Sequence, residues 1–421
     1  MILIPFIFFT LLTGYWSYRH GTLDICVYMS GLYAFTTLLA IFIVVFDMLG
    51  QGGVLFSDSD LKFGLLPTLL FCLCIGLCLA PFSLFYGREV KTITIRAPWA
   101  VDLLSLMLIA VSLLNLYLVA DSTLDILQGD LAKIRSDAYA GIESPAQLKS
   151  ETLPFIVRFF YYFNVSTVLC LPLVFYNICF RHTSWWWNLL LFFASLSMPI
   201  AGIQVADRTE IVFYGEMLFF CVILFYRYIP KRFKWSLAIV GLPLVVAAVA
   251  YVVAVTQARF DDKKSSSSVE RTIQYAGQGY LNFCFFYERG NFDYLSPERE
   301  FPLYHHFFLH KDSNSERRDE RMGEQGFFMS IFPTFIGDLL LDISPLGMIV
   351  WVIFYFMVVM LVFRRSHREE FDISEILFIY ILAAVPIFGI FYYRLFFFTY
   401  TFTLILVLGT YVVSKFKFVL K

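Results

Sequence analysis

The sequence predicts an all-α, polytopic membrane protein with about 11 transmembrane helices. Hydrophobic residues make up 59% of the chain, only 15% is charged, and the mean hydropathy is +0.72, well outside the range of soluble domains. Apolar runs of about 20 residues recur along the chain, as helices that cross a bilayer require. The eight cysteines lie mostly inside these runs, which favours buried thiols over a disulfide framework.

The apolar runs give the predicted spans in order. The first has no basic segment before it and no small-residue cleavage site, so it is predicted to be a retained span rather than a signal peptide. Two stretches, 184–227 and 373–413, are each long enough for two crossings of about 20 residues. The spans are placed near 2–17, 25–48, 64–86, 98–120, 154–180, 185–204, 209–226, 235–255, 344–363, 373–392 and 395–414.

The distribution of basic residues predicts the orientation. If the N-terminus faces outward, the inward connections and the C-terminal end carry 15 lysines and arginines. The short outward turns carry only Lys62, Arg208 and Arg394. The positive-inside rule therefore favours an N-terminus outside and a C-terminus in the cytoplasm.

Two larger segments are then predicted on the outer side, at 121–153 and 256–343. Inside the second, 327–341 is apolar but too short for a span, so we expect a re-entrant or interfacial helix there. The chain is thus organised as spans one to eight over 1–255, a large extracytoplasmic loop over 256–343, and spans nine to eleven over 344–421.

Charge in this protein is concentrated at the outward face. Ten of the 32 basic residues fall within 256–343, interleaved with aromatic residues. Arginine at a span end commonly snorkels to lipid headgroups. Several on one face also suit a diphosphate, because guanidinium groups bind phosphate oxygens bidentately and stay charged. The arginines in question are Arg135, Arg158, Arg208, Arg259, Arg271 and Arg394.

Candidates for proton transfer on the same face include Glu270 and His305. The histidines at 305, 306 and 310 lack the spacing of a zinc site. Asp58 and Asp60 in the first outward loop could share a divalent cation, although a solvated turn explains them as well. The sequence contains no phosphate-binding glycine loop, serine nucleophile elbow or HExxH motif, so no motif for a cofactor is recognised.

Three local patterns accompany this layout. They are Ala206-Asp-Arg-Thr-Glu210, Tyr275-Ala-Gly-Gln-Gly-Tyr-Leu-Asn-Phe283, and Phe332-Pro-Thr-Phe-Ile-Gly-Asp-Leu-Leu-Leu-Asp342 followed by Pro345-Leu-Gly347. The patterns and the large outward loop before the last few spans resemble the bacterial oligosaccharide repeat-unit polymerases, the Wzy-type O-antigen and capsule polymerases. That family has ten to fourteen spans, and the resemblance implies a GT-C-like polymerase or ligase architecture.

The resemblance implies glycosyl transfer at the outer face of the bacterial inner membrane. A glycan on undecaprenyl diphosphate is the donor, a lipid-linked repeat unit is the acceptor, and undecaprenyl diphosphate is released without a metal ion. Catalysis would involve Arg208, Arg259 and Arg271, with Glu270 or His305 as base, while Arg135, Arg158, Arg394, Tyr275 and Tyr280 would bind the diphosphate or the sugars. A chain-length regulator and a flippase are the protein partners implied, and nucleic acid is not one.

Three other functions remain open from the residues. An O-antigen ligase-like glycan transferase would use similar arginines with a different acceptor. A metal-dependent polyprenyl-phosphate glycosyltransferase would depend on Asp58 and Asp60. A lipid-linked oligosaccharide transporter would need polar residues at mid-membrane, where the predicted spans are mostly apolar.

Overall fold

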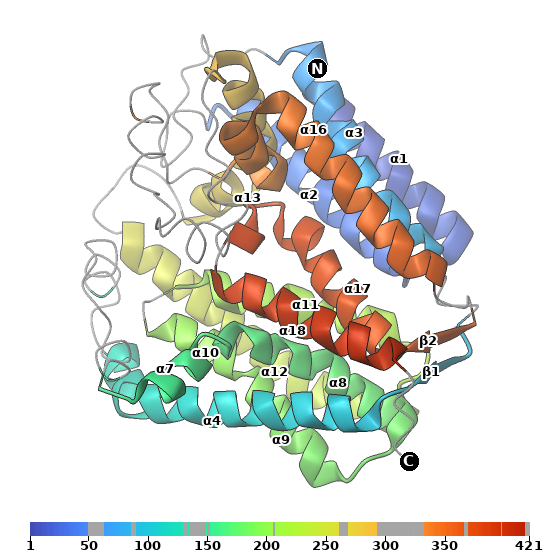
Figure 1. The fold of residues 1–421 in the computed structure, drawn as a ribbon. Coiled ribbons are helices and arrows are strands. Elements are labelled where there is room, and N and C mark those ends of the chain that lie inside the picture. The colour runs from blue at the N-terminus through green and yellow to red at the C-terminus, as the bar shows by residue number, and fades with distance from the viewer. Residues whose placement is uncertain are drawn as a thin grey trace. The chain divides into compact units, whose positions relative to one another are not determined.

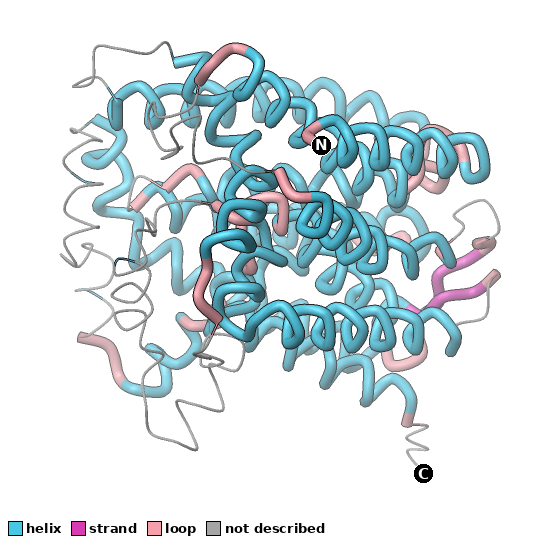
Figure 2. The backbone as a smooth tube through the Cα atoms, turned by 90° about the horizontal axis from the view of Figure 1, so that it is seen from above, coloured by secondary structure: helices cyan, strands magenta, loops and turns pink. Residues whose placement is uncertain are grey.

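In the computed structural model, most of the described residues lie in helices (Figure 2). The other described residues form turns, loops and one short pair of strands. The structure describes residues 1–48, 63–85, 90–128, 134, 149, 152–204, 207–260, 268–292, 323, 332–365, 369–396 and 398–416.

The chain divides into two compact units. Unit 1 consists of Met1–Glu89, Ser265–Arg368 and Ile381–Thr401, and unit 2 of Val90–Lys264, Glu369–Tyr380 and Phe402–Lys421. Both units are therefore built from segments far apart in the sequence.

Unit 1 contains a group of packed helices visible in Figure 1. Helix α2 begins at Asp24, whose carboxylate accepts a hydrogen bond from Cys26 N at 2.9 Å and caps the helix. A further helix, α13, packs against α2, α3 and α16. The helices of this group are α1 (Leu3–His20), α2 (Ile25–Val45), α3 (Leu65–Leu79) with the 3-10 turn η1 (Ala80–Leu84), α13 (Ser268–Arg289) and α16 (Thr334–Arg365).

Helix α16 is broken near its start. Ile343 and Ser344 have non-helical backbone angles, and Ser344 lies at φ 68°. Pro345 explains the break, because proline supplies no N–H for the helix and disfavours helical geometry in the residue before it. Every residue of the short helical piece before the break, 334–342, is buried within unit 1.

Unit 2 contains the remaining helices. The predicted span at 154–180 is divided into four short helical pieces, because Asn164, Ser166 and Thr167 form side-chain hydrogen bonds and Pro172 interrupts the backbone pattern. The pieces and helices are α4 (Pro98–Gln128), α7 (Phe155–Tyr161), η2 (Asn164–Leu169), α8 (Cys170–Tyr176), the π-helical turn η3 (Asn177–Arg181), α9 (Trp185–Ser195), α10 (Ser197–Ile203), α11 (Thr209–Phe225) and α12 (Lys231–Phe260). Helices α17 (Ile373–Phe388) and α18 (Phe398–Lys415), the latter preceded by η4 (Arg394–Phe396), contribute residues to both units.

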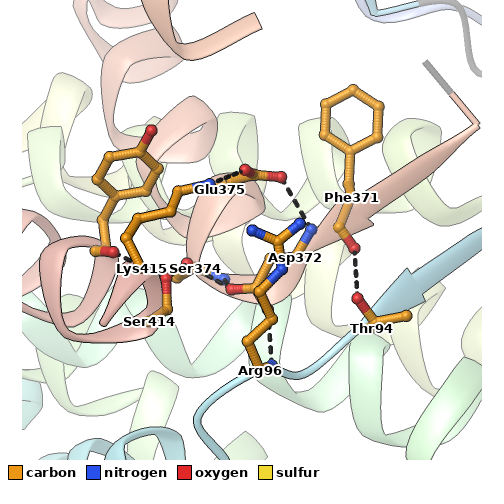
Figure 3. A network of polar contacts seen from close by, with 9 residues as sticks. Thr94, Arg96, Phe371, Asp372, Ser374, Glu375, Ser414 and Lys415 are labelled. Carbon is orange, nitrogen blue, oxygen red and sulfur yellow. Dashed lines mark hydrogen bonds and ion pairs between the residues drawn. The ribbon is translucent and has the colours of Figure 1, made fainter. Parts of the chain in front are cut away.

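Figure 3 shows a polar network in unit 2. Strand β1 (Thr92–Thr94) pairs in parallel with β2 (Glu370–Asp372). The buried Asp372 carboxylate accepts hydrogen bonds from Ser374 N at 3.0 Å and from Arg96 N at 2.8 Å. Glu375 accepts from Asp372 N at 2.9 Å and forms an ion pair with Lys415, so Asp372 and Glu375 make a capping box at the start of α17.

Replacing Asp372 by alanine is expected to lower the free energy of unfolding of this part by about 2–4 kcal/mol, because a helix cap is lost and buried N–H groups lose their acceptor. The measurement is the unfolding temperature of purified protein in detergent. Glu370→Ala, an exposed position in the same strand, is the matched control and should change it little. Equal effects of the two variants would contradict this role of the network.

Contacts within unit 2 join connections between spans that the predicted topology places on the same side of the membrane. Arg181 pairs with Asp102, with Nη2 and Oδ2 at 2.8 Å, and Tyr228 OH donates to Val90 O. Together with the pairing of β1 and β2, these contacts join four predicted inward connections, at 86–98, 180–185, 226–235 and 363–373. The pairing agrees with alternating spans, while the side of the membrane stays a prediction.

Helix occurs in each of the eleven predicted spans. Within the described ranges, six helical segments are long and apolar enough to cross a membrane: Ile25–Val45, Leu65–Leu84, Pro98–Ala120, Asn164–Arg181, Trp185–Ile203 and Thr334–Arg364. The number eleven and the large outer loop stay predictions. All eight cysteines are free thiols, and only Cys179 is more than slightly exposed.

Candidate functional site

A stripe of buried polar side chains runs along α13. Arg271, Gln274, Gln278 and Asn282 follow one another at spacings of three and four residues, so they lie on one face of the helix. All four are buried, and Arg271 is only 5% exposed. Arginine and amide side chains are mostly exposed in proteins, so four of them buried on one helix face mark that face as a candidate site.

Two glycines hold α13 close to its neighbours. A Cβ atom on Gly277 would lie 2.7 Å from the carbonyl carbon of Leu39 and 2.8 Å from Ala40 N in α2. A Cβ on Gly279 would lie 2.7 Å from Thr334 Cγ2 and 2.9 Å from Ile390 O. The Gly-Gln-Gly sequence thus allows α13 to be wedged between two backbones.

The start of α16 is joined to the turn that follows α17. Thr334 N donates to Phe391 O and Phe335 N to Gly389 O, both at 2.9 Å, and Tyr393 N donates to Asp338 Oδ2 at 2.8 Å. Thr334 lies at φ 68°, a strained conformation for a β-branched residue. Backbone strain held in place by this many contacts is common at functional sites.

Four half-buried aromatic side chains cover this junction. The Phe332 ring packs on Tyr275 of α13, with centroids 4.6 Å apart, and on Phe391 and Tyr392 of the turn, both at 5.7 Å. We call these four residues the aromatic cluster. It links α13, the start of α16 and the turn into one surface.

Arg394 lies at the end of the same turn and is 4% exposed. Its guanidinium group lies 4.4 Å from the ring centroids of both Phe388 and Tyr400, and Nη1 donates to Tyr392 OH at 3.3 Å. The aromatic rings stabilise the cation and fix its orientation. Arg271 lies one helical turn before Tyr275, a member of the aromatic cluster, and Arg394 donates to Tyr392 of the same cluster.

Only some of the site residues predicted from the sequence lie near this junction. Arg271, Glu270, Tyr275 and Arg394 lie around this junction of unit 1, with Glu270 half-buried in the first turn of α13. We call the stripe, Thr334, the aromatic cluster and Arg394 together the α13 site.

Tyr280 occupies a different environment. Its hydroxyl is 2.8 Å from Thr68 Oγ1 and its ring packs on Phe71, so this ring contacts protein side chains rather than solvent. Burial raises the pKa of Tyr280, and burial raises the pKa of the neighbouring Cys284 thiol to about 12. Both groups therefore stay protonated at neutral pH, which is unfavourable for a nucleophile or a base.

Among the described residues, three of the predicted arginines lie in unit 2. Arg208 immediately precedes α11 and is 8% exposed, and Asp207 accepts from Thr209 N at 3.0 Å. Arg208 is therefore buried at the N-terminus of α11, where a cation opposes the helix dipole. Arg158 is half-buried in α7, and Arg259 lies in α12, where its side chain is outside the described residues.

Several predicted residues fall outside the described part of the chain: Arg135, His305, Asp58 and Asp60. Among the residues the structure does describe, no group of three or more histidine, cysteine, aspartate or glutamate side chains is placed to hold a metal ion.

Sequence reasoning missed Gln274, Gln278, Asn282 and Thr334. The signal for the first three was present as a helical repeat of polar residues. It was overlooked because aromatic residues on the remaining faces made the segment look like an interfacial loop.

The fold and the site define a helical protein that is embedded in a membrane and carries a buried polar site. Comparison of the chain with protein-family models, with curated proteins and with solved structures finds no match.

Proposed function

We propose that this protein is a metal-independent membrane glycosyltransferase that polymerises undecaprenyl-diphosphate-linked oligosaccharide repeat units at the outer face of the bacterial inner membrane. The proposal includes the predicted topology, with the N-terminus outside and the C-terminus in the cytoplasm. The proposed protein partners are a flippase and a chain-length regulator.

The observation that carries the proposal is the burial of Arg271 on the same helix face as three amide side chains. A substrate with a diphosphate and several sugars needs both kinds of group. Guanidinium groups suit the phosphate oxygens. Amides, hydroxyls and aromatic rings suit sugars, because binding sites for small molecules combine apolar walls with a few placed polar groups.

In the proposed reaction a hydroxyl oxygen of the acceptor attacks the anomeric carbon of the donor glycan. The new C–O bond forms as the bond from that carbon to the diphosphate oxygen breaks, and undecaprenyl diphosphate leaves with the electron pair. The hydroxyl proton passes to a base, for which Glu270 and His305 remain candidates. Arginines stabilise the charge that develops on the diphosphate.

Transport of a lipid-linked oligosaccharide is a second candidate, favoured by one observation. Helix α16 is interrupted at Ile343 and Ser344, directly after the buried Asp338 and Asp342. Interrupted helices with buried charged residues occur in secondary transporters. The experiment below separates the two candidates.

The test is surface glycan profiling of a deletion strain complemented with wild type, Arg208→Ala or Arg259→Ala at matched protein levels. We expect wild type to restore a long-chain ladder, and each arginine variant to leave lipid-linked glycan at a single repeat. The expected reduction in chain elongation is about 10²–10³-fold for loss of one charge-stabilising group.

Other outcomes have defined meanings. Long chains that remain on the carrier lipid in the deletion strain indicate a ligase. Lipid-linked units that accumulate on the cytoplasmic side indicate a transporter. Unchanged ladders in both variants would assign Arg208 and Arg259 to snorkelling at the membrane surface instead.

A further inference from the structure

Three buried oxygen atoms along the α13 site have no hydrogen-bond partner within the described part of the chain: Gln274 Oε1, Asn282 Oδ1 and Thr334 Oγ1. Their side chains are 3%, 0% and 2% exposed. Buried polar atoms in native proteins nearly always have partners, so each exception calls for an explanation.

The orientation of the Asn282 amide is fixed by its neighbours. Its Nδ2 donates to Phe332 O at 3.0 Å and to Gln278 Oε1 at 3.2 Å. Both of these atoms are acceptors, so the nitrogen must face them and the oxygen must be the unpartnered end. Gln274 has the same arrangement, because its Nε2 donates to Met48 O at 2.8 Å. What is missing at both amides is a hydrogen-bond donor.

Thr334 lies near Asn282. The Cγ2 atom of Thr334 faces Gly279, which lies one helical turn before Asn282 on α13. Asn282 also donates a hydrogen bond to the carbonyl of Phe332, two residues before Thr334. A hydroxyl can both donate and accept, so Thr334 Oγ1 and Asn282 Oδ1 together match a ligand hydroxyl. The half-buried aromatic cluster adjoins them.

We infer that Asn282 and Thr334 bind hydroxyl groups of a carbohydrate whose ring lies on the aromatic cluster. This inference rests on the proposed function, since it names the part of the α13 site that binds the sugars rather than the diphosphate. Both oxygens are covered in this conformation. The ligand therefore reaches them by displacing side chains of the cluster, a change that is common on binding.

Thr334→Val is the decisive variant. Valine keeps the size and the β-branch of threonine, and with them the strain at positive φ, but removes the hydroxyl. If the hydroxyl is merely an unsatisfied buried group, its loss should leave ligand binding unchanged and should not lower stability. If it binds a sugar hydroxyl, binding should weaken by about tenfold while the protein stays as stable as wild type or becomes more so.

The matched variants isolate the hydroxyl. Thr334→Ser retains the hydroxyl and should bind the ligand as wild type does. Thr334→Ala removes both the hydroxyl and the β-branch and should bind as weakly as Thr334→Val. Thr37→Val removes a buried hydroxyl in the same unit that already donates to Tyr33 O at 2.6 Å, so it should leave binding unchanged.

The measurement is the rise in unfolding temperature of the purified full-length protein with two probes. One is bare undecaprenyl diphosphate, and the other is undecaprenyl diphosphate carrying an oligosaccharide, extracted from the deletion strain. We expect a larger rise with the glycan-bearing lipid in wild type, Thr334→Ser and Thr37→Val. In Thr334→Val and Thr334→Ala only the rise due to the bare carrier should remain.

An equal rise with both lipids in wild type, or a full glycan-dependent rise in Thr334→Val and Thr334→Ala, would overturn the inference. Failure of the proposed function is seen separately. In that case the deletion strain keeps its glycan ladder, while the glycan-dependent rise and its loss in Thr334→Val are still observed.

Discussion

Arg271→Ala is expected to reduce elongation of the surface glycan by about 10²–10³-fold, the loss typical when a group that stabilises developing charge is removed. Arg271→Lys should restore only part of the activity, because an ammonium group cannot make the two parallel hydrogen bonds of a guanidinium to a diphosphate. The measurement is the length distribution of lipid-linked glycan in complemented deletion strains with matched protein levels.

The control is Arg289→Ala. Arg289 lies in the last turn of the same helix but is exposed, with its guanidinium 5.4 Å from the Phe285 ring centroid. Its loss should leave both glycan length and unfolding temperature close to wild type. Since a buried arginine can also have a structural role, the unfolding temperature of each variant must be measured. A loss of glycan that only parallels a loss of folded Arg271→Ala protein would contradict a direct role.

Gly277→Ala is expected to destabilise the protein by about 1–3 kcal/mol, and Gly277→Val by more, because the added atoms overfill a packed contact. The Cβ would lie within 2.8 Å of backbone atoms of Leu39 and Ala40, and backbone cannot move aside as a flexible side chain can. The α13 helix would be forced away from α2. The measurement is the unfolding temperature of purified protein together with the yield of folded protein.

Gly31→Ala in α2 is the matched control. A Cβ there meets nothing within 4 Å, and alanine is the better helix former by about 0.5–1 kcal/mol. The same substitution should therefore destabilise at 277 and be neutral or stabilising at 31. Two changes of the same sign and size would show that helix propensity, not close packing, determines the effect at 277.

The sequence predicted the helices well where hydrophobicity alone decides them. Helix α2 starts where the apolar run starts, because Asp24 caps it. The break before the ninth span was predicted within a few residues, since Pro345 marks it. The predicted span at 154–180 was less accurate, because its continuity depends on side-chain hydrogen bonds made with residues as distant as Thr403.

The candidate site was predicted only in part. Arg271, Tyr275 and Arg394 were identified because arginine and aromatic residues stand out in an apolar chain. Their proximity could not be predicted, since it depends on Phe332 packing against both α13 and the turn after α17. The buried amides were missed because polar residues are normally expected on the outer face of a helix.

The pairing of β1 with β2 has a consequence for biosynthesis. Ile93 pairs with Phe371, so unit 2 cannot be completed until the ribosome has made nearly the whole chain. Helices α4 to α12 are therefore made before Asp372, and the backbone N–H of Arg96 lacks this acceptor until then, a stage at which chaperones and proteases can act. A chain that ends before residue 369 would contain every helix from α1 to α16 and still leave unit 2 unfinished.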